Sequence, residues 1–181
     1  MLAQIGLQFS VVVTDIDETR REGEEPTAFV KRLAREKALA GLQMSAIKVP
    51  TLGADTVVLL DDRILGKPAN REDAADMLRM MSGREHLVLS AVALARSLDQ
   101  VDVVLNTTRV TFAELPEDFI QWYCTTDEPL DKAGAYAIQG KAGQFVSNVE
   151  GSYSCVMGLP LYETWLMLTE HGIATGLEAS R

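Results

Sequence analysis

Two short apolar runs, at residues 57–60 and 64–65, flank the dipeptide Asp61-Asp62. The spacing is typical of a β-hairpin, because a two-residue turn joins adjacent antiparallel strands and sets their register. With Asp61-Asp62 as the turn, Val58 pairs with Leu65, and a slip of one residue would turn every apolar side chain to the other face. The chain is therefore predicted to contain a sheet with a hairpin at this point.

One end of this hairpin carries polar side chains. Continuing the register sets Thr56 opposite Lys67, with Asp55 one step away. The small residues Gly53 and Ala54 precede Asp55 and would let a ligand approach the backbone closely. A carboxylate, a hydroxyl and an ammonium are thus expected to converge in a site, and a surface ion pair is the alternative.

Hydrophobic periodicity, capping residues and turn residues predict the other elements. Helices are expected at residues 1–5, 26–42, 70–81, 115–122 and 161–170, and strands at 8–14, 86–95, 101–113 and near 145 and 153. The strands and helices mix without strict alternation. The expected fold class is therefore α/β or α+β, with a mixed sheet in one domain over residues 1–181.

Charge and composition narrow the function. The net charge of −9 argues against broad nucleic-acid binding, whereas a few local lysines and a metal ion can still hold a small phosphate ligand. No apolar run approaches the roughly 18 residues of a membrane span, and residues 1–6 do not resemble a secretory signal. Cys124 and Cys155 are far apart, as expected of core residues in a reducing compartment. A cytoplasmic protein that binds neither membrane nor nucleic acid is expected.

Lys37 lies on the apolar stripe of the helix expected at 26–42. Its ammonium either extends to the edge of the stripe or points into a site that binds an anion. Glu18 lies in the acidic segment 15–25, which is either a solvated face or the source of an oxygen ligand for Mg²⁺ or Mn²⁺.

The segment 131–140 contains glycines that permit close backbone contact. Lys132 offers a partner for phosphate, and the amide of Gln139 has both a donor and an acceptor with which to read a base edge. A structural Gly-rich turn is the alternative for this segment.

Taken together in their order along the chain, these segments resemble the Maf family of nucleotide pyrophosphatases. The resemblance extends over nearly the whole chain and implies a fold similar to that of the inosine triphosphate pyrophosphatases. That fold has an elongated mixed sheet flanked by helices, with two lobes and a central cleft. The matching motifs are residues 32–38, 53–58, 66–68, 131–140, 151–153 and 158–161.

The resemblance also implies roles for individual residues. Asp55 matches the general base of the family, and Glu18 and Asp55 match the positions that contact a divalent cation, Mg²⁺ or Mn²⁺. Lys37 and Lys67 match the phosphate-binding lysines. Family members are often homodimers, so a homodimer is expected here as well.

Substrate choice follows from a further match. Thr56 and Gln139 match positions associated with base selection, and the segment 136–139 resembles the branch acting on dTTP and UTP more than the branch acting on 7-methyl-GTP. The expected reaction converts dTTP and UTP to the monophosphate and pyrophosphate. Two alternatives stay open: modified nucleotides as the substrates, or a non-catalytic regulatory protein of septum formation.

The sequence departs from the family pattern at its start. Family members open with a strand and a Ser-x-Ser-Pro-Arg-Arg loop that supplies phosphate-binding arginines, and residues 1–6 correspond to the helix after that loop. We expect this segment to have been omitted from the sequence or to be disordered; a genuinely shortened protein is the alternative.

Overall fold

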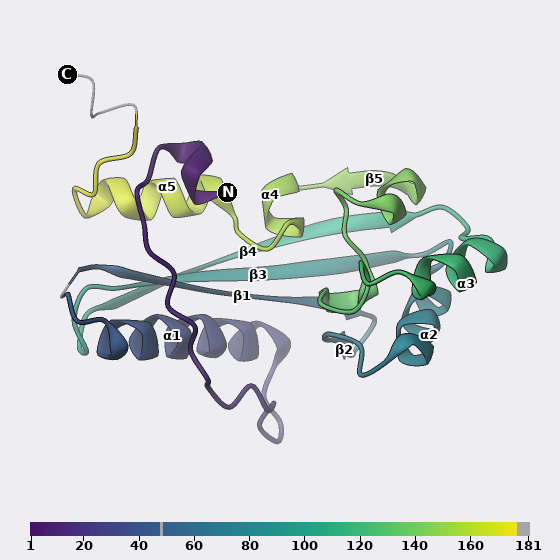
Figure 1. Ribbon diagram of the computed structural model, residues 1–181, viewed down its shortest axis with the longest axis horizontal. Helices are drawn as coiled ribbons and strands as arrows, with labels where there is room; N and C mark the ends of the chain where they lie inside the picture. The colour runs from purple at the N-terminus through teal and green to yellow at the C-terminus, as the bar shows by residue number, and fades with distance from the viewer. Residues whose placement is uncertain (48, 177–181) are drawn as a thin grey trace. The chain divides into compact units, whose positions relative to one another are not determined.

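The structure is a computed structural model that describes residues 1–47 and 49–176. It contains a five-stranded sheet in the order β2-β1-β3-β4-β5 together with helices (Figure 1). β1 pairs antiparallel with β2, and β4 pairs antiparallel with β5. The strands are β1 (Thr51–Leu60), β2 (Arg63–Leu65), β3 (Glu85–Ala95), β4 (Val101–Phe112) and β5 (Val146–Glu150). The α-helices are α1 (Pro26–Met44), α2 (Arg71–Met81), α3 (Glu117–Thr125), α4 (Tyr153–Val156) and α5 (Leu161–Glu170), and the 3₁₀ helices are η1 (Leu2–Ile5), η2 (Ala133–Ala135) and η3 (Lys141–Phe145).

The chain divides into two compact units. Unit 1 comprises Met1–Asp55, Ser90–Asn106 and the described part of Gly158–Arg181, and unit 2 comprises Thr56–Leu89 and Thr107–Met157. The mixed α/β class with helices flanking a sheet is confirmed. The cleft implied by the resemblance, and the single-domain organisation, stay predictions. Within the described ranges, no helix is both long enough and apolar enough to cross a membrane.

In unit 1, α1 and α5 cover opposite faces of the strands (Figure 1). Leu52 and Ala54 of β1 pack with Met167 and Leu168 of α5 in one hydrophobic cluster. Gly53, between them, faces α1, since a side chain there would collide with the backbone of that helix. Successive side chains of a strand point to opposite faces, so β1 presents alternate residues to the two helices.

In unit 2, α2 and α3 lie in contact, and the core gathers around aromatic side chains. Phe112 of β4 and Tyr136 approach in a T-shaped arrangement with ring centroids 4.8 Å apart. His86 of β3 is 2% exposed, and its Nε2 lies 2.8 Å from the Tyr136 hydroxyl. A buried imidazole is favoured in its neutral form, so burial lowers the pKa of His86 to about 4.

That pKa predicts a pH dependence of stability. Between pH 6.5 and pH 4 the unfolded chain binds a proton at His86 and the folded chain does not. The free energy of unfolding should therefore fall by up to about 3 kcal/mol as the pH drops through this window. Denaturant titrations at several pH values should show this component in the protein and in His171→Gln, but not in His86→Gln. Equal pH dependence in all three proteins would contradict the prediction.

Most elements expected from the sequence are confirmed. The hairpin register is the predicted one, with Val58 paired to Leu65, although the ladder ends there and does not extend to Lys67. The helix expected at 70–81 is α2, and the Asn70 side chain caps it by accepting a hydrogen bond from the Asp73 backbone N–H at 2.9 Å.

Two strand predictions are wrong. Residues 8–14 are extended but form no strand, and Val11 and Val13 are exposed. An extended segment becomes a strand only beside a partner, and no strand of the described chain pairs with this one. Residue 153 opens α4 instead, because the Ser152 hydroxyl accepts a hydrogen bond from the Cys155 N–H and caps a helix there.

Candidate active site

The position of Asp55 follows from the pleat of β1. Gly53 faces α1 and packs against Ala34 and Ala38, so Asp55, two residues further on, has its side chain on the same face. Lys37 lies beside Ala34 and Ala38 on the buried side of α1. Glycine at position 53 thus brings the helix close enough for a lysine of α1 to reach a carboxylate of β1.

Lys37 joins two carboxylates from distant parts of the sequence. Its Nζ lies 2.7 Å from Asp55 Oδ1 and 2.7 Å from Glu18 Oε1. The side chains of Asp55, Lys37 and Glu18 are 9%, 23% and 50% exposed, so the cluster runs from the interior to the surface. The structure therefore brings together three residues that the sequence placed in a loop, a helix and a strand.

Burial and hydrogen bonding act in opposite directions on Lys37. Burial disfavours its charge, but hydrogen bonds from the ammonium to Asp55 and to Glu18 outweigh that effect and raise its pKa. Lys37 is thus a fully charged ammonium at neutral pH. The sequence allowed the Lys37 ammonium either to extend to the edge of the apolar stripe or to point into a site that binds an anion. In the structure Lys37 is partly buried, and its ammonium contacts two carboxylates of unit 1.

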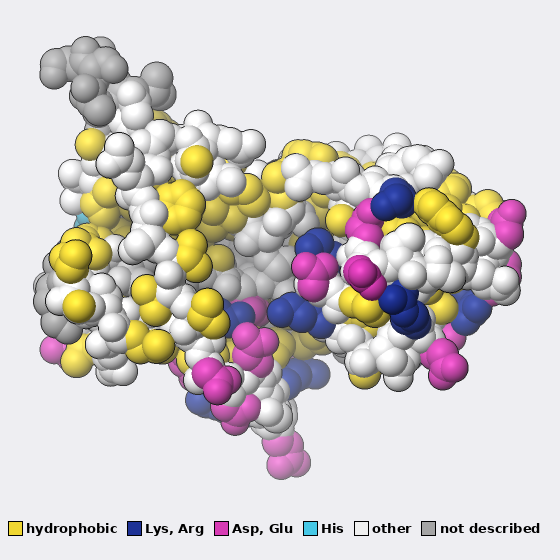
Figure 2. Space-filling model, viewed as in Figure 1, with side chains coloured by type: hydrophobic (Ala, Val, Ile, Leu, Met, Phe, Trp, Pro, Cys, Tyr) yellow, Lys and Arg dark blue, Asp and Glu magenta, His cyan; other side chains and the backbone are white. Residues whose placement is uncertain are grey.

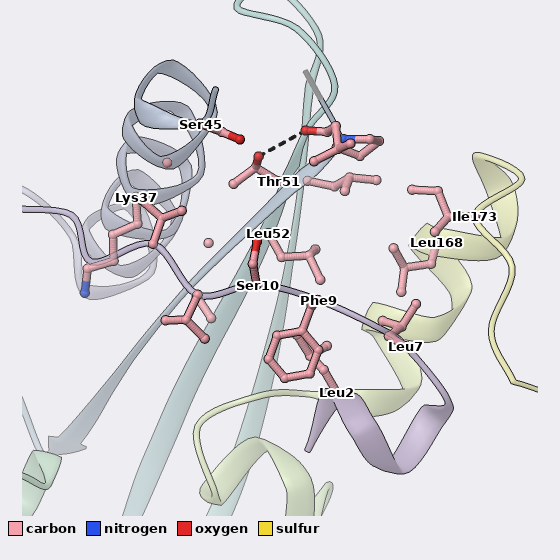
Figure 3. Close-up of a pocket in the computed structure, with 18 of the residues that line it drawn as sticks. Leu2, Leu7, Phe9, Ser10, Lys37, Ser45, Thr51, Leu52, Leu168 and Ile173 are labelled. Atoms are coloured by element: carbon pink, nitrogen blue, oxygen red, sulfur yellow. Dashed lines mark hydrogen bonds between the residues drawn. The ribbon is translucent and has the colours of Figure 1, made fainter. Parts of the chain in front are cut away.

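A cavity of about 780 Å³ borders this cluster in unit 1. Its lining comes mainly from the segment 7–12 and from β1, α5 contributes Leu168, and Lys37 is the one charged residue among the described lining residues. In Figure 3 the apolar side chains of Leu7, Leu52 and Leu168 face the cavity, whereas the Lys37 ammonium points away from them. Phosphate groups need charged and hydrogen-bonding partners, and this mainly apolar lining offers few of them, whereas the Lys37 cluster is charged.

Unit 2 holds the other residues singled out in the sequence. The Gly134 N–H donates to the Gly66 carbonyl oxygen at 3.0 Å and so ties the segment 131–140 to the residue before Lys67. Gly134 has φ of 69°, and a side chain there would press on Val58 at 2.8 Å. Glycine at position 134 is therefore required both by the backbone conformation and by the close approach to β1.

Three charged side chains, those of Asp131, Lys132 and Lys67, lie near this hydrogen bond. Lys132 Nζ lies 2.8 Å from Asp131 Oδ2, and this hydrogen bond, with a smaller contribution from the charge of Lys67, lowers the pKa of Asp131. Lys67 is exposed, and the Lys132 side chain is 42% exposed. The ammonium groups of Lys67 and Lys132 are thus accessible to an anion.

Gln139 is exposed at the far end of the same segment. Glu128 fixes the backbone that follows it: its carboxylate accepts from the Lys141 N–H at 2.8 Å and from the Tyr123 hydroxyl at 3.0 Å. The exposed Gln139 thus lies two residues before an anchored backbone position. Thr56 follows Asp55 in β1, and neighbouring residues of a strand point to opposite faces.

The sequence alone did not single out Arg32. Its guanidinium contacts Glu24, Glu36 and the Thr19 carbonyl, and so connects α1 to the acidic segment that carries Glu18. The available signal was the acidic run at residues 15–25 followed by a helix rich in basic residues.

The carboxylates of the Lys37 cluster fit a divalent cation. Among residues 1–47 and 49–176, no group of three or more His, Cys, Asp or Glu side chains could hold a metal ion alone. Glu18 and Asp55 nevertheless meet at one positive charge, that of Lys37. Mg²⁺ is commonly held by one or two carboxylates together with water and phosphate oxygens, so the chemistry of this pair fits such an ion.

The chain is similar to known proteins over most of its length. A family model described as Maf-like protein matches residues 1–171. The chain is 51% identical over 180 residues to the dTTP/UTP pyrophosphatase of Shewanella sp. (strain MR-7), a match that covers 96% of this chain and 92% of that protein. It is 50% identical over 169 residues to the dTTP/UTP pyrophosphatase of Escherichia coli (strain K12), covering 93% of this chain and 85% of that protein.

Proposed function

This chain belongs to the Maf family, and on that premise we propose that it hydrolyses dTTP and UTP to the nucleoside monophosphate and pyrophosphate. Relatives with about half of their residues identical over most of the chain carry the name dTTP/UTP pyrophosphatase. The structural observation that supports the proposal is the Lys37 ammonium held 2.7 Å from both Asp55 and Glu18. Such a cluster offers a base, a phosphate partner and two oxygen ligands together.

We assign the roles as follows. Asp55 is the general base, and Glu18 and Asp55 hold a divalent cation, Mg²⁺ or Mn²⁺, which when bound neutralises charge on the triphosphate. Lys37, Lys67 and Lys132 bind phosphate oxygens and stabilise the negative charge of the transition state.

The contact between Lys37 and Asp55 suggests the order of events. In the unliganded chain the Asp55 carboxylate accepts a hydrogen bond from Lys37, which makes it a poor proton acceptor. A phosphate oxygen that takes over the Lys37 ammonium frees Asp55 to accept a proton from water. The water oxygen then attacks the α-phosphorus, the bond from that phosphorus to the bridging oxygen breaks, and pyrophosphate leaves with the electron pair.

Pyrophosphate release from a panel of nucleoside triphosphates, with Mg²⁺ or Mn²⁺, tests the proposal. The chain should be assayed beside a version preceded by the strand and Ser-x-Ser-Pro-Arg-Arg segment of the family. Activity of the longer version alone would show that the reaction is assigned correctly and that the shorter chain needs this segment. The expected products are the monophosphate and pyrophosphate, with dTTP and UTP as the preferred substrates. Silence of both versions would overturn the proposal and favour a non-catalytic role in septum formation.

The base-selection role of Gln139 is a further prediction. Replacing Gln139 with Ala removes the amide that would face the uracil or thymine edge, and kcat/KM for UTP and dTTP should fall about ten-fold relative to CTP. Gln144→Ala, a matched change at another exposed glutamine of unit 2, should leave the ratio unchanged. Equal substrate ratios in Gln139→Ala and the unmodified protein would remove Gln139 from this role.

Three properties complete the proposal. The function accounts for a cytoplasmic location, because nucleoside triphosphates are intracellular metabolites. We also propose a homodimer, as the resemblance implies, which light scattering of the purified chain would test. Modified pyrimidine nucleotides belong in the same assay panel as alternative substrates.

A further inference from the structure

Residues 15–25 form a strongly acidic segment that lies against the basic helix α1. The segment carries Glu18, which we assign to the divalent cation, and it has no regular secondary structure. Acidic and basic side chains mingle on the loop that projects at the bottom of the view (Figure 2). A loop of this composition tends to stay solvated, so specific contacts must hold Glu18 in place.

Arg32 of α1 supplies those contacts. Its Nε and Nη2 donate to the two carboxylate oxygens of Glu24 at 2.7 and 2.9 Å, in a bidentate pair. Its Nη1 donates to Glu36 at 3.1 Å, and its Nη2 also donates to the backbone carbonyl oxygen of Thr19 at 3.0 Å. A guanidinium presents donors in a fixed planar fork, so these contacts define the orientation of the loop as well as its attachment.

The pair of Arg32 and Glu24 is sheltered from water. Their side chains are 13% and 10% exposed, unlike the half-exposed Glu18. Exposed ion pairs contribute little, whereas a sheltered bidentate pair resists competition from water and salt. The loop is therefore anchored more firmly on the side of Arg32 than on the side of Glu18.

The anchor acts on the residue next to Glu18. Arg32 binds the carbonyl of Thr19, and Lys37, five residues further along the same helix, binds the Glu18 carboxylate. In our mechanism a phosphate takes over Lys37, so Glu18 then loses its contact with α1. The contacts of Arg32 would still hold the segment 18–24 against the helix at that stage, together with the more exposed pair of Arg21 and Glu36, whose Nη2 and Oε1 lie 3.2 Å apart.

We propose that Arg32 is a positioning residue that holds Glu18 where its carboxylate can bind the divalent cation once Lys37 has turned to the substrate. The inference rests on the proposed function for the role of the cation. Arg32 does not touch the substrate, and it acts through the Thr19 carbonyl and Glu24.

Direct binding of Mn²⁺, followed by the spin-resonance signal of the free ion in the presence of a non-hydrolysable UTP analogue, tests the proposal. Arg32→Gln should raise the dissociation constant for Mn²⁺ about ten-fold, the usual effect of losing a residue that orients a metal ligand. Glu24→Gln should also raise the dissociation constant for Mn²⁺, and it provides the test if Arg32→Gln fails to fold. Arg35→Gln, a matched change at an exposed arginine of α1, should leave the constant unchanged.

A second readout reports on the loop itself. Trypsin cuts after Arg20 and Arg21, so cleavage there should be several-fold faster in Arg32→Gln than in Arg35→Gln. In a Glu18→Gln background, Arg32→Gln should weaken Mn²⁺ binding no further, because the ligand that it positions is already lost. A purely structural role of Arg32 would add a second loss to the first.

The outcomes separate this inference from the proposed function. Equal Mn²⁺ affinity in the unmodified chain and in Arg32→Gln would overturn the inference, whatever the activity. Weaker Mn²⁺ binding by Arg32→Gln, together with no pyrophosphate release from either version of the unmodified protein, would support the inference and overturn the proposed function.

Discussion

Asp55→Asn is expected to lower kcat for pyrophosphate release from dTTP and UTP by about 10³-fold, within the range for loss of a positioned general base. The amide cannot accept the proton of the attacking water, and it replaces a carboxylate that we assign to the cation. KM should change much less, because the lysines that we assign to the phosphates, Lys37, Lys67 and Lys132, are still present. Steady-state kinetics at saturating Mg²⁺, corrected for the folded fraction, measures the effect.

The same substitution should not damage the fold. It removes a carboxylate that is 9% exposed, and Lys37 keeps its contact with Glu18. Residues placed for catalysis are often not the most stabilising choice, so the melting temperature of Asp55→Asn should equal or exceed that of the unmodified protein. Asp62→Asn changes the charge equally at an exposed residue of the nearby hairpin turn and should leave kcat unchanged. A kcat of Asp55→Asn within ten-fold of the unmodified value would exclude Asp55 as the base.

Local rules predicted the local structure. The dipeptide Asp61-Asp62 set the register of β1 and β2, and Asn70 marked the start of α2, because turns and caps depend on a few adjacent residues. Residues 8–14 show where such rules end. The valine run at residues 11–13 is typical of a strand, but strand pairing depends on a partner elsewhere in the chain.

The sequence predicted which residues belong to the candidate site, but not which of them contact one another. Periodicity put Lys37 on the buried stripe of α1, and the hairpin put Asp55 near a strand end, where Lys67 was its expected neighbour. The observed partner is Lys37, 18 residues away in sequence, because Gly53 lets α1 pack directly on β1. Such a contact depends on tertiary packing, which one sequence does not specify.

The largest stability effect is expected for Lys37→Met. The substitution leaves the carboxylates of Asp55 and Glu18 facing each other without the ammonium that now lies 2.7 Å from each. Removing one partner of a buried ion pair commonly costs 3–5 kcal/mol, and the partial exposure of this cluster favours the lower end, about 3 kcal/mol at pH 7. Activity should also fall, with kcat/KM for UTP lower by about 10²-fold, because a charged contact to phosphate is lost.

Two further variants, a double variant and a control, identify the cause of the stability loss in Lys37→Met. In Lys37→Met with Asp55→Asn, the uncompensated charge inside the protein is gone, so the double variant should recover most of the lost stability while staying inactive. Lys31→Met removes an exposed lysine of the same helix and should change neither property. Denaturant titrations of the four proteins form a double-mutant cycle with Lys31→Met as its control. If the stability changes caused by Lys37→Met and by Asp55→Asn simply add, the ion pair does not stabilise the fold, and Lys37 is held in place by its packing on α1 alone.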